Sequence, residues 1–391
     1  MGLLLLTLRA GSLAAQTVLK IVRVPTNTPP SDTLFVAGSF NAWNPRNTAY
    51  SLTKSTDGTY QITLPDSLGA IEYKFTRGSW KTVEVGADKQ QLANRKADLR
   101  QKGEITHEVL TWNAARPSGP QKHTTTPQVR VVDESFRIPQ LERNRRVLVY
   151  LPADYAKRSN QRYPVLYMHD GQNVFDDATS FSGEWGVDEI LDHLRATGQD
   201  PTGSIVVAID SDEQHRADEY IPWYNAELKA GGQGGQYVDF LAQTLKPYID
   251  AHYRTRPDAP YTGIAGSSLG GLISVYAALK YPLIFGRVGA FSPAFWACND
   301  SLQAFAKTHP AAATTRFYFV CGLKESETML PLMTAWRDEL QTGGVLAVNL
   351  SFHAPADGQH REWFWRREFT DAYAFLFDKM APVKNKARKQ K

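Results

Sequence analysis

The sequence lacks the features that mark several protein classes. Its 391 residues include only two cysteines, Cys298 and Cys321, which excludes a small fold held together by many disulfides. The sequence leaves open whether these two form a disulfide or remain buried thiols. No segment approaches the roughly 18 apolar residues that a membrane-spanning helix requires, so we expect no membrane span.

Fingerprints of cofactors are also missing. The chain has no G-x-G-x-x-G motif and no P-loop, so nothing indicates a nucleotide or phosphate cofactor. His169, Asp170 and Asn173 are residue types that bind cations, but no second cluster with the spacing of metal ligands accompanies them. We therefore expect neither a cofactor nor a metal.

Positive charge is concentrated at the C-terminus. The formal net charge is +4, and the tail 383–391 contributes five positive charges, from Lys384, Lys386, Arg388, Lys389 and Lys391. Without this tail the chain is close to neutral. The charge pattern therefore gives no argument for a nucleic-acid partner.

The strongest positive signal is the stretch 261–271, Tyr-Thr-Gly-Ile-Ala-Gly-Ser-Ser-Leu-Gly-Gly. It begins with a short apolar run typical of a strand, which leads into Gly266-Ser267-Ser268-Leu269-Gly270, and an amphipathic, helix-like segment follows. In a nucleophile elbow the turn from strand to helix is so sharp that the residues two before and two after the serine must be small. Gly266 and Gly270 meet that requirement around Ser268. The pattern therefore predicts Ser268 as a nucleophile.

A serine hydroxyl becomes a good nucleophile only when a base takes its proton. In this kind of fold an acid and then a histidine follow the serine in the chain. The strand-like run 316–322 leads to Glu325, our predicted acid, with Glu327 as the alternative.

Three histidines downstream compete for the role of base. His309 lies in a polar loop, His353 closes the last strand-like run 345–352, and His360 lies in the loop after that run. We favour His360, because the loop after the last strand is where such a fold places its base.

The tetrahedral intermediate of ester hydrolysis needs two backbone N–H donors. One normally comes from the residue after the nucleophile, which is Leu269 here. The strand-like run 163–169 leads into Asp170-Gly171-Gln172-Asn173, so we expect Gly171 or Gln172 to supply the second donor.

Several stretches carry a family resemblance: 163–173, 185–189, 216–223, 245–250, the elbow and 292–296. Together they resemble the esterase D-like branch of the α/β-hydrolases, which holds feruloyl and acetylxylan esterases, enterochelin-type siderophore esterases and mycobacterial mycolyltransferases. The resemblance covers about residues 130–380. It implies an α/β-hydrolase fold with Ser268 and His360 in the catalytic roles and the acid at Glu325.

Aromatic rings offer stacking surfaces for sugars and aryl esters, although most tryptophans of a large domain are buried. Trp296 follows a strand end close to the expected cleft, and Trp185 lies in one of the family-like stretches. We therefore take Trp296 and Trp185 as candidate substrate-binding residues.

The first 110 residues have a different character. The runs 34–40, 59–64, 70–75 and 104–110 alternate between apolar and polar residues and are separated by turn residues, which is typical of a small immunoglobulin-like β-sandwich. Residues 38–45, 73–84 and 94–95 resemble starch- and glycogen-binding modules over about residues 18–112. That resemblance implies carbohydrate binding by Trp43, Trp80, Lys74 and Asn94.

Changes in amino-acid composition along the chain indicate the domain boundaries. We expect a truncated signal peptide at 1–16, the sandwich at 18–112, a Pro/Gly/Ser/Thr-rich linker at 113–127, the hydrolase at 128–382 and the basic tail at 383–391.

Taken together, the sequence predicts a secreted or periplasmic serine esterase that needs no cofactor. Its expected partner is a polysaccharide or a small molecule that bears an ester, with acetyl or feruloyl esters of a polysaccharide favoured. Three alternatives stay open: a siderophore trilactone esterase, an acyltransferase, and a non-catalytic glycan-binding protein.

Overall fold

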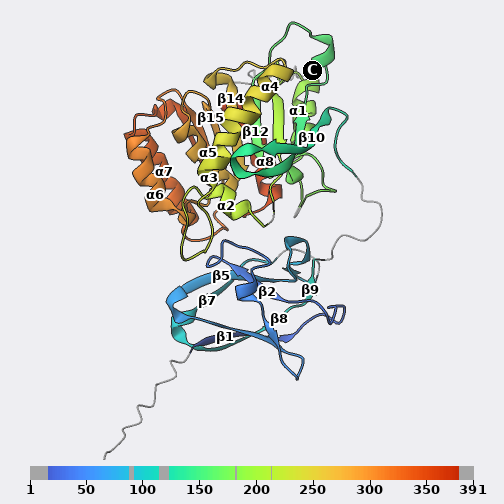
Figure 1. The fold of residues 1–391 in the computed structure, drawn as a ribbon, viewed down its shortest axis with the longest axis vertical. Coiled ribbons are helices and arrows are strands. Elements are labelled where there is room, and N and C mark those ends of the chain that lie inside the picture. Colours follow the sequence, from blue (N-terminus) through green and yellow to red (C-terminus); the bar gives the residue numbers. More distant parts are fainter. Residues whose placement is uncertain (1–15, 88–91, 114–122, 181–182, 213, 378–391) are drawn as a thin grey trace, which may run out of the picture. The chain divides into compact units, whose positions relative to one another are not determined.

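The computed structural model describes residues 16–87, 92–113, 123–180, 183–212 and 214–377 (Figure 1). The chain divides into two compact units, residues 1–118 and 119–391, and each is described by itself. Of the predicted signal peptide only Gln16 is described, and the predicted basic tail lies outside the described residues.

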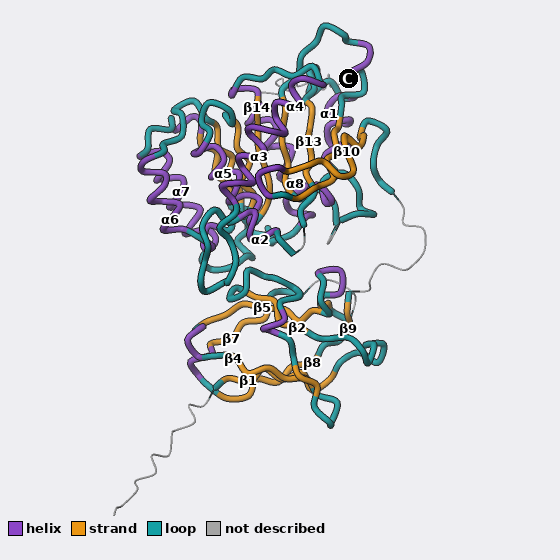
Figure 2. The backbone as a smooth tube through the Cα atoms, viewed as in Figure 1, coloured by secondary structure: helices purple, strands orange, loops and turns teal. Residues whose placement is uncertain are grey.

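The first unit is an all-β sandwich. One sheet has the strand order β3-β4-β1-β8, a second the order β2-β5-β7, and β6 pairs with β9. The strands are β1 Thr17–Arg23, β2 Phe35–Gly38, β3 Thr53–Lys54, β4 Tyr60–Leu64, β5 Ala70–Thr76, β6 Glu84–Val85, β7 Arg95–Asp98, β8 Gly103–Glu108 and β9 Thr111–Trp112. Figure 2 shows that, in its described part, strands and loops dominate this unit.

Alternation of side chains explains why these segments form a sandwich. Along β1, Leu19 and Ile21 are fully buried whereas their neighbours are partly exposed. Along β5, Tyr73 and Phe75 point into the same core. In β1 and β5 alternate side chains therefore pack into the core, as the period of two requires.

The second unit has an eight-stranded sheet with the order β10-β11-β13-β12-β14-β15-β16-β17. The strands are β10 Val129–Ile138, β11 Arg143–Tyr150, β12 Val165–His169, β13 Ile205–Ile209, β14 Thr262–Ser267, β15 Arg287–Phe291, β16 Arg316–Val320 and β17 Leu350–His353. Strand β11 runs antiparallel to both neighbours, and from β13 to β17 all pairs are parallel. This arrangement confirms the predicted α/β class.

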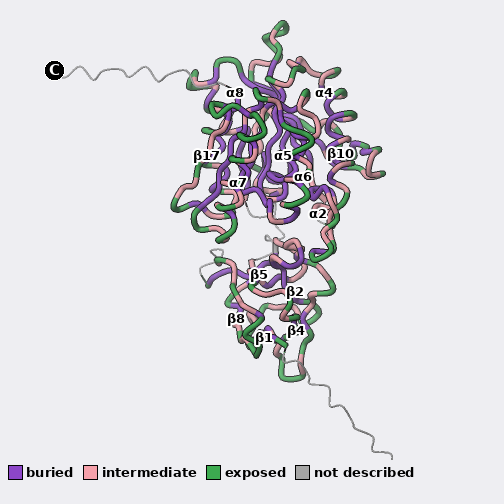
Figure 3. Tube along the Cα trace, turned by 90° about the vertical axis from the view of Figure 1, so that its left-hand side faces the viewer, coloured by how far each residue is buried: buried purple, intermediate pink, exposed green. Residues whose placement is uncertain are grey.

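Helices cover the sheet on both faces. They are α1 Val187–Ala196, α2 Arg216–Tyr220, α3 Gly234–Phe240, α4 Lys246–His252, α5 Leu269–Lys280, α6 Asn299–Thr308, α7 Met329–Thr342 and α8 Glu362–Phe377. Helices α1 and α8 share a core cluster with alternate residues of the strands, and α5, which is outside that cluster, packs on β14 and β15. Figure 3 shows that buried residues follow the central strands and α5. Within the described residues, no helix is both long and apolar enough to cross a membrane.

Both faces being covered explains the composition of the central strands. Every residue of β12 and β13 is buried, and apart from His169 at the end of β12 they have apolar or aromatic side chains and do not alternate with polar ones.

The last strand is shorter than the sequence predicts. We expected strand-like structure over 345–352, but residues Ala347–Asn349 form a 3₁₀ turn and β17 begins at Leu350. The amide of Asn349 donates to the carbonyl oxygen of Ala313, which holds this turn away from the ladder with β16.

Candidate active site

Ser268 lies at the sharp turn between β14 and α5. Its backbone has φ 57° and ψ −121°, a conformation that costs a non-glycine residue energy and is held by the surrounding structure. The Ser268 N–H donates to the carbonyl oxygen of Phe291 at 2.9 Å. A Cβ atom at Gly266 would lie 3.0 Å from the carbonyl carbon of Gly270, which explains why the predicted small residues are needed here.

His169 fills the space beneath this turn. Its Cδ2 would lie 3.0 Å from a Cβ atom at Gly266, and its Nδ1 lies 2.9 Å from the hydroxyl of Tyr237. Burial lowers the pKa of His169 to about 3, so its ring is neutral at physiological pH. We therefore interpret His169 as support for the elbow.

The structure brings His360 and Glu325 into direct contact. His360 Nδ1 lies 2.8 Å from Glu325 Oε2, with the histidine side chain 39% exposed and the glutamate side chain 1% exposed. If Nδ1 carries the proton that it donates to the carboxylate, the lone pair of Nε2 is left available to accept a proton.

Three hydrogen bonds hold the carboxylate of Glu325. Besides His360, the N–H of Gly322 donates to Oε1 at 2.6 Å and the hydroxyl of Ser292 donates to Oε1 at 2.7 Å. The indole N–H of Trp365 in turn donates to Ser292 Oγ at 2.9 Å. A buried carboxylate is costly unless it is hydrogen-bonded, so this chain of donors makes the charged Glu325 tolerable.

Two glycines let the loops that carry this pair touch. A Cβ atom at Gly322 would lie 2.0 Å from the carbonyl carbon of Gly358, so only glycine permits this approach. The N–H of Lys324 donates to the carbonyl oxygen of Gly358 at 3.1 Å. The loop after β16 is thus fastened to the loop after β17, and the acid is carried to the histidine.

The competing residues lie elsewhere. Glu327 is exposed, and it is Glu325 that contacts His360. His353, the last residue of β17, stacks on Tyr318 with ring centroids 5.0 Å apart. His309, which directly follows α6, stacks on Phe305.

Ser268 and His360 both lie beyond the carboxyl ends of parallel strands, at one edge of the sheet. In the described part of the chain, no hydrogen bond joins the Ser268 hydroxyl to His360. Catalytic hydrogen bonds are often long until substrate binds.

Candidate oxyanion donors lie at the same edge. Leu269 is the first residue of α5, and the first N–H groups of a helix have no acceptor within it. The 3₁₀ turn Gly171–Asn173 follows β12, and a Cβ atom at Gly171 would lie 2.7 Å from the carbonyl carbon of Ile209. Glycine therefore lets this turn pack directly against the end of β13.

An ion pair fixes the start of this turn. Asp170 has φ 55° and accepts two hydrogen bonds from Arg216, at 2.7 and 2.8 Å. Although burial works against its charged form, the Arg216 guanidinium lowers the pKa of Asp170. The Gln172 side chain is bonded to Ser211, which ties the turn to the loop after β13.

The two candidate tryptophans differ in position. Trp185 is 4% exposed and packs against Phe291, Trp365 and Phe369, so it is a core residue and our prediction of substrate contact is wrong. Trp296 is partly exposed in a 3₁₀ turn after β15. The N–H of Ala294, two residues earlier, donates to the carbonyl oxygen of Ser268 at 3.0 Å, which places this segment beside Ser268.

In the first unit the four predicted carbohydrate-binding residues differ in their contacts. Trp43 and Trp80 are half-buried, with ring centroids 6.2 Å apart. Lys74 Nζ donates to the carbonyl oxygen of Leu92, and Asn94 Nδ2 donates to Glu72. The two tryptophans therefore form an aromatic pair, while Lys74 and Asn94 are bonded to the protein itself.

Both cysteines are buried free thiols. Burial raises the pKa of each to about 12, so neither is a reactive thiolate. Across the described residues no group of three or more His, Cys, Asp or Glu side chains is arranged to hold a metal ion.

Sequence reasoning missed the supporting roles of Ser292 and Trp365. The Ser292-Pro293 dipeptide at the end of β15 was visible within a family-like stretch, and the φ of Ser292 is 44°, an unusual value for serine. Trp365 gives no local signal, because its bond to Ser292 joins residues far apart in the chain.

The model of a family described as "Putative esterase" matches residues 138–376. The uncharacterised protein YbbA of Bacillus subtilis is 26% identical over 248 residues, which cover 60% of this chain and 94% of YbbA. An endo-1,4-beta-xylanase/feruloyl esterase of Xylanibacter ruminicola is 29% identical over 147 residues, 37% of this chain and 19% of that protein. An alpha-amylase of Niallia circulans is 44% identical over 86 residues, 22% of this chain and 7% of the amylase.

Among solved structures, the enterobactin esterase of Shigella flexneri has a TM-score of 0.53 and 19% sequence identity. The match covers 88% of this chain and 88% of that one. At this identity the likeness concerns the fold.

Proposed function

The chain belongs to the esterase family and is a carboxylic ester hydrolase, and on that premise we propose that Ser268, His360 and Glu325 are its catalytic triad. The observation that carries the proposal is the buried Glu325 carboxylate bonded to His360, at the same sheet edge as the strained turn of Ser268. This order of serine, acid and histidine along the chain is the one that the fold uses.

In the proposed mechanism the Ser268 hydroxyl attacks the ester carbonyl while His360 Nε2 takes its proton. Glu325 stabilises the imidazolium that forms. The negative oxygen of the tetrahedral intermediate is held by the N–H of Leu269 and that of Gly171 or Gln172. The alcohol leaves with the proton from His360, and water then repeats the sequence on the acyl-serine.

For the substrate we propose acetyl or feruloyl esters on a polysaccharide. Two relatives support this choice, one named a xylanase/feruloyl esterase and one an alpha-amylase. A carbohydrate-binding module raises the effective concentration of the esterase near its substrate, so the two functions fit together. A polymeric substrate also fits the proposed secreted or periplasmic location, which cell fractionation of the native host tests.

A panel of substrates tests the proposed chemistry. We expect turnover of p-nitrophenyl acetate and methyl ferulate, and a higher kcat/KM on acetylated xylan or feruloylated arabinoxylan. A fluorophosphonate should label the protein at Ser268, which peptide mass spectrometry locates. If the enzyme preferred a catecholate trilactone, the proposed substrate would be a siderophore and not a polysaccharide. Inertness on every ester, with glycan binding retained, would favour the binding protein instead.

We further propose that the Trp43–Trp80 pair binds glucan. Trp80→Ala should weaken retention in starch affinity electrophoresis by about tenfold, because aromatic anchors supply much of the binding energy at such surfaces. Trp363→Ala, which alters a tryptophan exposed on the other unit, is the matched control. Equal retention of the wild type and Trp80→Ala would show that this module does not bind starch through the pair.

A further inference from the structure

We propose that residues 123–126, here called the anchor segment, position the oxyanion loop, residues 170–180, of the esterase site. The inference rests on the proposed function, because it concerns the same donors. These residues fall within the stretch predicted as a linker, yet they belong to the second unit and are hydrogen-bonded to other residues of it.

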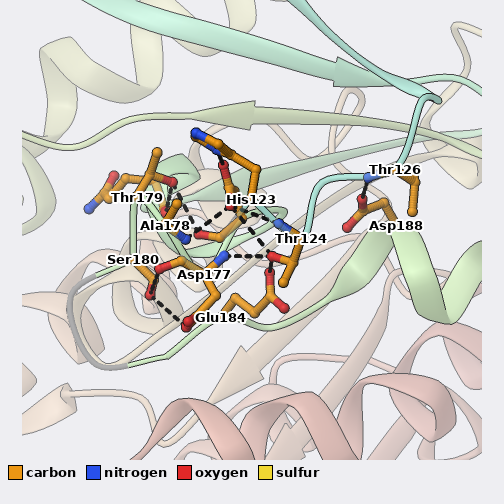
Figure 4. Close-up of polar contacts among 11 residues, drawn as sticks. His123, Thr124, Thr126, Asp177, Ala178, Thr179, Ser180, Glu184 and Asp188 are labelled. Atoms are coloured by element: carbon orange, nitrogen blue, oxygen red, sulfur yellow. Dashed lines mark hydrogen bonds and ion pairs between the residues drawn. The ribbon is translucent and has the colours of Figure 1, made fainter. Parts of the chain in front are cut away.

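The first contact joins the anchor segment to Asp176. His123 Nδ1 lies 2.6 Å from Asp176 Oδ2, and the N–H of Thr124 donates to Asp176 Oδ1 at 3.2 Å. The hydroxyl of Thr124 also accepts from the N–H of Asp177 at 2.8 Å. Figure 4 shows His123 and Thr124 lying against the turn that holds Asp177, Ala178, Thr179 and Ser180.

The turn 176–180 is also hydrogen-bonded to the segment that holds the candidate oxyanion donors. The carbonyl oxygen of Asp176 accepts from the N–H of Thr179, and Asp176 Oδ1 accepts from the N–H of Ala178. The hydroxyl of Thr179 donates to the carbonyl oxygen of Gln172 at 2.7 Å. Fixing that peptide restricts the torsions of Gln172, whose own N–H is a candidate donor.

A second chain of contacts runs from Thr124 to the helix that follows the proposed catalytic base, His360. The Thr124 hydroxyl donates to Glu184 Oε2 at 2.8 Å, and Glu184 Oε1 lies 3.3 Å from Arg366 of α8. Helix α8 begins two residues after His360. Gly186 permits this approach, because a Cβ atom there would lie 2.4 Å from the Arg366 guanidinium carbon.

A third bond fixes the end of the anchor segment. The N–H of Thr126 donates at 2.7 Å to Asp188, a fully buried residue of the first turn of α1 (Figure 4). The segment thus bonds to the loop after the oxyanion donors and to the helix that follows it.

The physical reason for such an anchor is preorganisation. Oxyanion donors stabilise the transition state best when they are held in place beforehand, and small misplacements lower the rate strongly. The N–H of Trp185 donates to the carbonyl oxygen of Asn173, so the chain is back beside the oxyanion turn at Trp185. The anchor segment lies outside this part of the chain and bonds to Asp176, Asp177 and Glu184 within it.

The test is Thr124→Val in the full-length chain. This change keeps the branched shape but removes the hydrogen bonds of the hydroxyl to Asp176, Asp177 and Glu184. We therefore expect about a tenfold lower kcat with KM changed less than about twofold. Thr124→Ser, which retains the hydroxyl, should restore kcat. Thr197→Val removes an exposed threonine hydroxyl beyond α1 and serves as the matched control.

Thr179→Val removes the hydrogen bond from Thr179 to the carbonyl oxygen of Gln172. This variant tests the proposal if Thr124→Val does not fold. The double variant should lose little more than either single variant, because both act through Gln172. An unchanged kcat in a folded Thr124→Val or Thr179→Val protein, or an equal loss in Thr197→Val, overturns the proposal. Ser268→Ala tests the proposed function separately. If that variant kept its activity, the proposed function itself would be wrong, whatever the threonine variants showed.

Discussion

Ser268→Ala is expected to lower kcat for p-nitrophenyl acetate by on the order of 10⁴- to 10⁶-fold, the range seen when a catalytic serine is removed. In the proposed mechanism the variant lacks the oxygen that forms the acyl-enzyme, so only binding and oxyanion stabilisation would remain. Its fold should be unaffected, because alanine adopts the φ of 57° at this turn as readily as serine does.

The adjacent Ser267 provides a matched control. It is the last residue of β14, it is 7% exposed, and the mechanism gives it no role. Ser267→Ala should therefore keep kcat within a few-fold of the wild type, with both variants melting near the same temperature. Appreciable turnover by Ser268→Ala after purification on a new column would rule out Ser268 as the nucleophile.

The features that the sequence predicted well have local signals. The glycine spacing around Ser268 and the strand and helix on either side lie within about twenty residues, and that pattern indicated both the α/β fold and the place of its site. Glu325 and His360 each follow a strand at the same sheet edge, so chain order alone pointed to them. The family and fold predictions are confirmed; the catalytic roles remain predictions.

The features that the sequence could not predict depend on contacts between distant residues. The exposure of Trp185 is set by Trp365 and Phe369 of α8, which no pattern near residue 185 reveals. The anchor segment looks like a linker because threonines beside a proline are typical of loops, while its partners Asp176, Glu184 and Asp188 lie more than 50 residues away.

Glu325→Gln is expected to lower kcat by about 10³- to 10⁴-fold, as loss of the charged partner does in comparable triads. The reason lies in the donors around the carboxylate. Gly322 and Ser292 both donate to Oε1, so the glutamine oxygen would have to face them and its NH₂ group would face His360. His360 Nδ1 would then have to accept a hydrogen bond, which puts the ring proton on Nε2.

That tautomer cannot take the proton of Ser268, so the defect should lie in chemistry and leave KM nearly unchanged. Ser292→Ala offers an intermediate case, because it removes one donor but leaves the charge, and we expect a loss of about tenfold. Glu327→Gln makes the same chemical change at an exposed position two residues away and should leave kcat close to that of the wild type. If Glu327→Gln and Glu325→Gln were equally impaired while both stayed folded, the hydrogen bond from His360 to Glu325 would not be what orients the base.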